Sequence, residues 1–310
     1  MEDDKLLVQI AQMYYMENKT QSEISRALHI HRSTISRMLK QCRDQGIVTI
    51  SINPQKAGTD SLETRLKETY NLKEAIVVPV SSGFSDMQKM EGMGQAANRY
   101  LQSILQDHMT IGFSWGKTTA TIVQYFKDNG ASNITCVPLI GGVEGRIESS
   151  YHVNTVTYEA SRHLNGSALL IDAPAFASSP EIRDILLSSE FNQTLVKYWK
   201  HTDIAFVGIG SLKASNSRWH FYYGDKIFKN VELNHVTGDV CAHYFDKQGQ
   251  HIPSSLDDLL ISISIEDLKK IPYRIGVAES IDKAEAIKAA MLGNYINVLI
   301  TTSETAEQIV

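Results

Sequence analysis

Seven short apolar runs, spread over residues 73–310, restrict the fold of this 310-residue chain more than any other feature. Segments with helical periodicity separate most of the runs, and strands that are apolar along their whole length are typical of a parallel sheet covered by helices. The sequence therefore predicts an α/β domain over residues 73–310. The predicted strands are Ala75–Val80, Thr110–Phe113, Thr135–Ile140, Ala168–Ile171, Ile204–Ile209, Tyr273–Ala278 and Ile296–Thr301. The predicted helices include Met87–Gln106, Thr118–Asp128, Val153–Leu164 and Lys283–Leu292.

The composition limits the class of protein. Hydrophobic residues make up 43% of the chain and charged residues 21%, which is enough to build a sizeable core. No apolar run approaches the ~18 residues of a membrane-spanning helix, and the acidic start lacks the pattern of a secretory signal. The cysteines Cys42, Cys136 and Cys241 are too few and too far apart for a disulfide framework or a paired-cysteine zinc module. We expect a cytoplasmic protein without a membrane segment.

The charge is unevenly distributed along the chain. The net charge of −5 at pH 7, taken over the whole chain, argues against nucleic acid as a partner. Residues 1–56 nevertheless contain eight Lys or Arg and six Asp or Glu, a net of +2, which leaves −7 for the rest. Five basic residues and no acidic residue occur between Ile24 and Arg43. Because salt screens surface fields beyond about 10 Å, the local charge matters more than the total.

The segment from Thr20 to Lys40 has the pattern of two short helices joined by a tight turn. Thr20 and Glu23 form a predicted capping box, the chain breaks at 29–31, and Gly46 is a predicted C-cap. This is the geometry of a helix-turn-helix, and a strand after it fits the wing of the winged variant. The predicted elements are a helix at 3–16, the helices Gln21–Leu28 and Arg32–Gln45, and the strand Ile47–Ile52.

The second helix of this pair presents polar and basic side chains that are suited to the major groove. Serine and threonine donate or accept hydrogen bonds there, and arginine binds guanine as a fork. Lys40, Arg43 and Gln21 are better suited to phosphates. The predicted DNA-binding residues are Gln21, Arg32, Ser33, Thr34, Ser36, Arg37 and Lys40. The alternative is a plain helical hairpin with a solvated basic face.

Two residues depart from the usual helix-turn-helix pattern. Ser25 occupies a position that is usually alanine, and His29 occupies the turn position that is usually glycine. A residue other than glycine in the left-handed conformation costs about 1 kcal/mol, so neither departure disables the motif. We therefore divide the chain into a winged helix-turn-helix domain at 1–56, a linker helix at 57–72 and an effector-binding and oligomerisation domain at 73–310.

Glycine-containing turns follow several of the predicted strands. The segment I-G-F-S-W-G-K-T-T, from Ile111 to Thr119, runs from a strand through a turn into a helix, an arrangement that suits a phosphate. Its spacing matches neither a P-loop nor a dinucleotide fingerprint, and a plain strand–helix turn is the alternative. Because parallel strands end at one edge of a sheet, these turns are expected to face one cleft. The predicted effector-binding residues are Gly112, Ser114, Gly116, Lys117, Thr118, Gly141, Gly142, Asp239 and Lys283.

Several of these residues also have a plain structural interpretation. Asp239 is suited to binding sugar hydroxyls, but it also suits a Gly-Asp turn. Lys283 is suited to binding an anion, but a single lysine is also common on a solvated surface. His152 and Asn154 follow a loop rich in Gly, Glu and Ser, where a single histidine is usually structural. The ten histidines show no metal-binding spacing, and no nucleophile signature occurs. The sequence therefore predicts anion binding, with no cofactor and no metal.

Ordered segments along essentially the whole chain resemble the SorC family of sugar-responsive bacterial transcriptional regulators. At the N-terminus they are K-T-Q-S-E-I-S-R, S-T-I-S-R-M-L-K and G-I-V-T-I-S-I-N. In the larger domain they are I-G-F-S-W-G, V-P-L-I-G-G, Y-H-V-N-T, D-I-A-F-V-G-I-G-S, G-D-V-C-A-H-Y-F-D and N-Y-I-N-V-L-I-T. Many family members have an arginine in the segment that here reads C-A-H-Y-F-D, so His243 occupies the position of a possible anion contact.

The resemblance implies a function for both parts of the chain. It implies a winged helix-turn-helix joined to a sugar-binding domain that resembles sugar-phosphate isomerases. It also implies a homotetramer that binds double-stranded operator DNA of a sugar-catabolic operon, as in sorbose metabolism. The implied effector is a phosphorylated sugar of the sorbose or sorbitol type. The phosphate-loop role of the family falls on Gly112, Ser114, Gly116, Lys117 and Thr118, the glycine pair on Gly141 and Gly142, and the late lysine on Lys283.

An enzyme is the alternative from a different class. A sugar-phosphate isomerase or deaminase with an appended DNA-binding module would use the same turns and lysines. Asp239, Glu279 and His243 are the candidate acid–base groups, although their spacing does not pair them. A lesser variant is an imine between a sugar carbonyl and Lys117 or Lys283. We expect a regulator that is not an enzyme.

Overall fold

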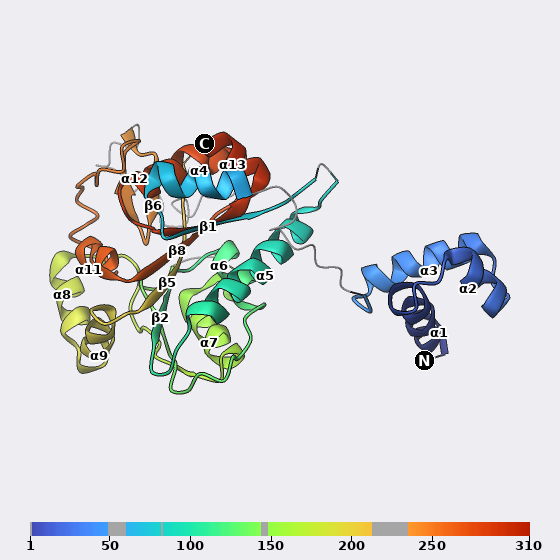
Figure 1. Ribbon diagram of the computed structural model, residues 1–310. Coiled ribbons are helices and arrows are strands. Elements are labelled where there is room, and N and C mark those ends of the chain that lie inside the picture. Colours follow the sequence, from blue (N-terminus) through green and yellow to red (C-terminus); the bar gives the residue numbers. More distant parts are fainter. Residues whose placement is uncertain (1, 49–59, 82, 144–147, 213–234) are drawn as a thin grey trace. The chain divides into compact units, whose positions relative to one another are not determined.

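A computed structural model describes residues 2–48, 60–81, 83–143, 148–212 and 235–310 of the chain (Figure 1). The chain divides into two compact units, Met1–Asn53 and Pro54–Val310. Each unit has its own hydrophobic core and is described by itself.

The smaller unit is built from helices. Helix α1 (Glu2–Ala11) continues into a π-helix, η1 (Gln12–Met16), and is followed by α2 (Gln21–Leu28) and α3 (Arg32–Asp44). These helices agree with the predicted ones, except that the π-helical turn was not expected. Their shared core consists of Ile10, Met13, Ile24, Ile35 and Leu39.

Local hydrogen bonds explain where these helices begin and end. The Thr20 hydroxyl accepts a hydrogen bond from the Glu23 amide at 3.3 Å, and the Glu23 carboxylate accepts one from the Thr20 amide at 2.8 Å, which confirms the capping box. His29 closes α2 in the left-handed conformation, with φ 56°. Helix α3 has Gln45 as its C-cap, and Gly46 follows in the left-handed conformation with φ 73°, so a glycine ends this helix as predicted. Most of the strand predicted at 47–52, and with it the wing, lies outside the described residues.

The larger unit contains a seven-stranded parallel sheet with the order β1-β9-β8-β5-β2-β3-β4. All seven predicted strands are present, which confirms the α/β fold class. The strands are β1 (Glu74–Val78), β2 (Thr110–Phe113), β3 (Thr135–Pro138), β4 (Ser167–Ala168), β5 (Ile204–Gly208), β8 (Tyr273–Val277) and β9 (Val298–Thr302).

Helices surround this sheet. Among the residues that the structure describes, the α-helices of the larger unit are α4 (Asp60–Tyr70), α5 (Asp86–Ile104), α6 (Lys117–Val123), α7 (Val153–His163), α8 (Pro180–Ser188), α9 (Glu190–Trp199), α11 (Ile265–Lys270), α12 (Ala284–Leu292) and α13 (Ser303–Ile309). The 3₁₀-helices η3 (Ser149–Tyr151) and η5 (Ile281–Lys283) precede α7 and α12. No helix among the described residues is long and apolar enough to cross a membrane.

An antiparallel hairpin, β6 (Gly238–Val240) and β7 (His243–Phe245), was not predicted. Its turn consists of Cys241 and Ala242, which both have positive φ angles, 50° and 63°. Tight hairpin turns of this kind usually contain Asn or Gly. The sequence therefore lacked the usual signal for this hairpin.

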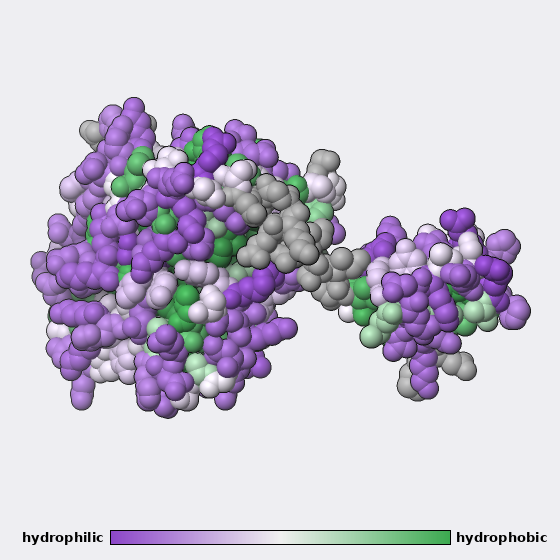
Figure 2. All heavy atoms as spheres, viewed as in Figure 1, coloured by the Kyte–Doolittle hydropathy of each residue, from purple (hydrophilic) through white to green (hydrophobic). Residues whose placement is uncertain are grey.

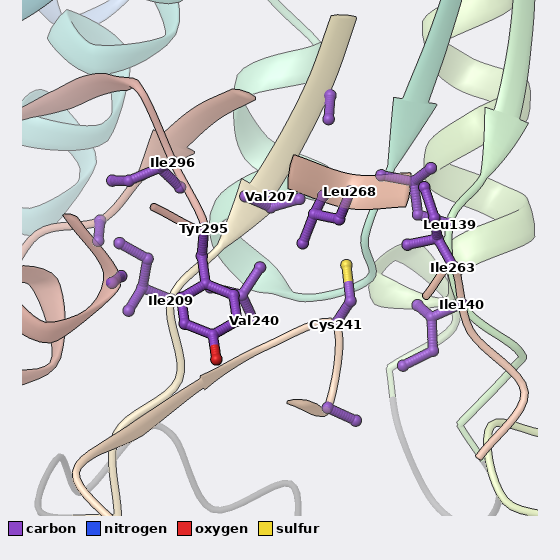
Figure 3. Close-up of a cluster of buried hydrophobic side chains, with 14 of the residues drawn as sticks. Leu139, Ile140, Val207, Ile209, Val240, Cys241, Ile263, Leu268, Tyr295 and Ile296 are labelled. Atoms are coloured by element: carbon purple, nitrogen blue, oxygen red, sulfur yellow. The ribbon is translucent and has the colours of Figure 1, made fainter. Parts of the chain in front are cut away.

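Alternate residues of each strand enter two different cores. In β5, Ile204 and Phe206 join α5, α6 and α7, whereas Ala205 and Val207 face the opposite core. That second core includes side chains from α4, α9, α11, α12 and α13, and Figure 3 shows Val207, Leu139, Val240 and Leu268 meeting there. Burial on both faces explains why the strands are apolar throughout.

The predicted linker helix, α4, packs within the larger unit. Its Leu66 is fully buried, and its Glu63 carboxylate accepts a hydrogen bond from the Val77 amide at 2.8 Å. Val77 lies in β1, the outermost strand at one end of the sheet. Glu63 thereby satisfies an amide that no neighbouring strand can reach.

We expect His29→Gly to raise the free energy of unfolding of the smaller unit by up to about 1 kcal/mol, because glycine adopts the left-handed conformation without the steric cost. Denaturant unfolding, followed by circular dichroism, measures the change. His108 has a similar φ of 65° in the larger unit, so His108→Gly is the control and should leave the smaller unit unchanged. A lower stability of His29→Gly would contradict the assigned conformation.

Candidate functional site

The turns predicted to bind an effector meet at one edge of the sheet. Strands β8, β5, β2 and β3 are successive neighbours and run parallel, so the segments that follow them emerge on the same side. Those segments contain Lys283, Gly210, the turn 114–117 and the pair Gly141–Gly142. Gly210, which the sequence analysis did not single out, pairs with Asp239 and brings the hairpin to this edge.

The turn after β2 is hydrogen-bonded to the neighbouring strand β5. The Ser114 amide donates to the Phe206 carbonyl at 3.1 Å, and the Ser114 hydroxyl accepts from the Gly208 amide at 3.0 Å. Gly112 lies within β2, where a Cβ atom would meet the Leu139 side chain. The predicted roles of Gly112 and Ser114 in a phosphate loop thus coincide with clear packing roles.

The same turn ends at Gly116, and Lys117 and Thr118 follow it at the start of α6. Gly116 has a φ of 127°, which favours glycine, and its amide donates to the Tyr151 carbonyl at 3.0 Å. Lys117 is exposed and Thr118 is half-buried at the start of α6. Within the described ranges, neither the Lys117 amine nor the Thr118 hydroxyl has a hydrogen-bond or ion-pair partner. These two side chains remain able to contact an anion.

The glycine pair after β3 is required by close backbone packing. The Gly141 amide donates to the Ile261 carbonyl at 2.8 Å, and the Gly142 amide donates to the Ala173 carbonyl at 2.9 Å. A Cβ atom on Gly141 would meet the Pro174 carbonyl. Both amide groups donate hydrogen bonds within the fold. The glycine pair therefore shapes this edge of the sheet and does not offer a backbone N–H donor to a ligand.

His152 lies beside the glycine pair. A Cβ atom on Gly142 would lie 2.5 Å from His152 Nε2. His152 Nδ1 accepts a hydrogen bond from the Asn154 amide at 3.2 Å, which leaves the proton on Nε2, and burial lowers the pKa of His152. The neighbouring Tyr151 carbonyl binds Gly116, so His152 stands between the turns that follow β2 and β3. The Asn154 side-chain amide instead donates to the Ile171 carbonyl and accepts from the Ile171 amide, both at 3.0 Å.

Asp239 and Lys283 lie within electrostatic reach of one another. Asp239 is buried in β6, and its carboxylate accepts a hydrogen bond from the Ala242 amide at 3.3 Å. Burial lowers the pKa of Lys283, whereas the carboxylates of Asp239 and Glu279 oppose that shift. No carboxylate of the described residues pairs directly with the Lys283 amine. The structure thus brings together two residues that are far apart in the sequence.

Six of the seven predicted DNA-binding residues lie in α3, and Gln21 is the first residue of α2. Arg32, Ser33, Ser36, Arg37 and Lys40 are exposed, whereas Thr34 and Gln21 are half-buried. Ile35, Leu39 and Cys42 face the core of the unit. Hydrophilic residues cover most of the face of this unit that is visible in Figure 2. The helix therefore presents a polar, basic surface that a DNA groove can receive.

His243 does not lie at the position expected for an anion contact. The residue is 8% exposed, and its Nε2 lies 2.7 Å from the Ile263 carbonyl. In the β6–β7 register His243 is opposite Val240, whereas Asp239 is opposite Tyr244, so His243 and Asp239 face opposite sides of the hairpin. Burial lowers the pKa of His243 to about 4, so its ring is neutral at pH 7. This removes one of the three acid–base candidates from the edge.

No group of three or more His, Cys, Asp or Glu that is able to hold a metal ion occurs in the described part of the chain.

The chain is similar to known proteins along nearly its whole length. A family of putative sugar-binding domains matches residues 55–310. The sorbitol operon regulator of Klebsiella pneumoniae is 39% identical over 308 residues, which cover 99% of this chain and 98% of that protein. The transcriptional regulator LsrR of Escherichia coli K12 is 30% identical over 312 residues, which cover 99% of this chain and 95% of that protein.

Solved structures show the same likeness. The crystal structure of the full-length sorbitol operon regulator SorC from Klebsiella pneumoniae matches with a TM-score of 0.82 and covers 99% of this chain and 98% of that chain. A probable sor operon regulator from Shigella flexneri matches with a TM-score of 0.74 at 37% identity, and the match covers 80% of this chain and 98% of that one.

We expect Gly141→Ala to destabilise the larger unit by about 1–3 kcal/mol, because the added methyl group meets the Pro174 backbone, which cannot rotate away as a side chain can. Thermal and denaturant unfolding measure the loss. Gly83→Ala is the matched control, since nothing lies within 4 Å of its Cβ position. Equal stability of the two variants would disprove the packing role of Gly141.

We expect His243 to make the larger unit less stable in acid. Above pH 6.5 the ring is neutral in both the folded and the unfolded chain. Below pH 6.5 the unfolded chain takes up the proton first, because burial holds the folded pKa at about 4. This contribution to stability is therefore lost as the pH falls from 6.5 to 4, by about 3 kcal/mol in all.

The variant His243→Gln isolates this effect, since glutamine keeps a donor for the Ile263 carbonyl but does not titrate. Urea unfolding at several pH values should show a shallower loss of stability between pH 6.5 and 4 than in the unmodified chain. Asp257 raises the pKa of His251, so protonation of His251 stabilises the folded state in acid. This contribution is present both in His243→Gln and in the unmodified chain. Identical pH profiles would contradict the assignment.

Proposed function

Because this chain belongs to the SorC family of sugar-responsive bacterial transcriptional regulators, we propose that it controls a sugar-catabolic operon through operator binding that a phosphorylated sugar modulates. The smaller unit binds double-stranded DNA, and the larger unit binds the effector at the carboxyl edge of its sheet. The observation that carries the proposal is the meeting of Asp239, Lys283 and the turns after β2 and β3 at that edge.

The chemistry of this edge suits a phosphorylated sugar. Lys283 is a half-buried amine without a direct carboxylate partner in the described chain, so a phosphate would supply the negative charge that it lacks. Lys117 and Thr118 add an exposed cation and a hydroxyl donor. The Asp239 carboxylate accepts hydrogen bonds, which sugar hydroxyls donate. We assign the effector to the sorbose or sorbitol type by analogy with the sorbitol operon regulator.

On the DNA side, the proposal assigns different roles to the exposed residues of α3. Arg32, Ser33 and Arg37 read base edges in the major groove, and Lys40 binds a phosphate. Gln21 begins α2 and suits a phosphate as well. The proposed domains are a winged helix-turn-helix at 1–56, a connecting helix at 57–72 and the effector and oligomerisation domain at 73–310.

Assembly and location complete the proposal. A symmetric oligomer, proposed to be a homotetramer, presents several reading helices and requires an operator with matching symmetry. The protein acts in the cytoplasm. The effector shifts DNA binding only if it binds one conformation of the oligomer better than another, because equal affinity for both conformations shifts nothing.

We expect a matching sugar phosphate to change the affinity of the full chain for operator DNA by about 5- to 150-fold, the usual range of coupling between sites. Fluorescence anisotropy with labelled upstream DNA of the operon, with and without the compound, measures the change. The unphosphorylated sugar is the control. The same assay followed by chromatography detects turnover of the sugar phosphate, and turnover would contradict a purely regulatory role.

We expect Arg37→Ala to weaken specific operator binding by about 1–3 kcal/mol, because a fork-like contact to guanine is lost. Competition between operator and mixed-sequence DNA separates this loss from a general loss of affinity. The matched control is Arg65→Ala, which changes an exposed arginine of α4 in the larger unit. An unchanged preference for operator DNA in Arg37→Ala would show that the recognition residue is assigned wrongly.

A further inference from the structure

Arg43 continues the row of DNA-facing residues on α3. Residues at spacings of four, eight and eleven lie on one side of an α-helix, so Arg43 shares a face with Arg32, Ser36 and Lys40. All four are exposed, and Arg43 lies in the last turn of the helix. Its guanidinium is therefore placed where the end of a recognition helix meets the DNA backbone.

A tyrosine from another helix holds this arginine. Arg43 donates a hydrogen bond from one guanidinium nitrogen to the Tyr15 hydroxyl at 3.0 Å. Tyr15 lies in the π-helical turn at the end of α1, is half-buried, and packs its ring edge-on against Tyr14 with 4.9 Å between the ring centroids. A ring fixed by packing gives the flexible arginine a rigid anchor.

The partnership leaves the positive charge of Arg43 available. A tyrosine hydroxyl is neutral, and no carboxylate of the described chain forms an ion pair with Arg43. Asp44, the next residue of α3, is exposed and forms no ion pair with Arg43 among the described residues.

We propose that Arg43 binds one DNA phosphate and that Tyr15 is the positioning residue that holds the guanidinium toward the backbone. The inference rests on the proposed DNA-binding function and extends the DNA-binding surface from α3 to the end of α1. Fixing the arginine before it meets DNA reduces the conformational entropy that is lost on binding. A phosphate contact adds affinity for any sequence and makes that affinity depend on salt.

The test uses the full chain and a labelled mixed-sequence DNA duplex, whose phosphates are the same whatever the operator sequence. Anisotropy titrations at several salt concentrations give the slope of log K against log salt for the unmodified chain, Arg43→Gln, Tyr15→Phe and the double variant. Arg43→Gln should flatten the slope by about 0.9, the value for one phosphate contact in B-DNA. Tyr15→Phe should weaken binding about threefold, as expected for one lost hydrogen bond.

The double variant distinguishes positioning from independent binding. If Tyr15 acts through Arg43, the double variant binds DNA about as tightly as Arg43→Gln alone. Tyr14→Phe and Arg65→Gln are the matched controls and should leave affinity and slope unchanged. Melting curves verify that each variant is folded, and Arg43→Gln changes only an exposed side chain.

Three results would overturn the inference while the proposed function stands. They are an unchanged slope in Arg43→Gln, an affinity of Tyr15→Phe equal to that of Tyr14→Phe, and losses that add fully in the double variant. A failure of the unmodified chain to bind any duplex would instead overturn the proposed function, and the assignment of this pair with it.

Discussion

The parallel direction of β8, β5, β2 and β3 is the constraint on which the rest of the structure depends. Because every strand of this group ends on the same side, residues from positions 114 to 283 meet at one edge without any local sequence signal for their contact. The sheet can hold this arrangement only because both of its faces are covered by apolar cores. The fold thus fixes the location of the proposed effector site before any single side chain determines its chemistry.

Stability and binding make different demands on the residues at this edge. Ser114, Gly141 and Gly142 serve mainly to hold the chain together, since their hydrogen bonds are made within the fold. Asp239 and Lys283 instead carry charge into a half-buried place, which costs free energy unless something compensates. This difference separates the residues that shape the site from those that are proposed to hold the ligand.

The sequence predicted the strands of the sheet and the helix α3 well, because apolar runs and capping residues are local signals. It did not predict the β6–β7 hairpin, whose Cys241–Ala242 turn lacks Asn or Gly, nor the burial of His243, which follows from strand register. The sequence singled out Gly141, but it did not predict why glycine is needed there. The Pro174 backbone leaves no room for a Cβ atom, and this contact joins distant segments of the chain. Likewise, the hydrogen bond from Arg43 to Tyr15 depends on how α1 crosses α3.

Calorimetric titration of the full chain and of Lys283→Met with matched phosphorylated and unphosphorylated sugars shows whether the Lys283 amine binds the phosphate of the effector. We expect saturable heat from a phosphorylated sugar with the unmodified chain, and at least tenfold weaker binding with Lys283→Met, since a charge-assisted contact contributes about 1.5–3 kcal/mol. The unphosphorylated sugar should bind both proteins weakly and equally. Tight binding of the unphosphorylated sugar, or equal affinity of the phosphorylated one for both proteins, would contradict this role of Lys283.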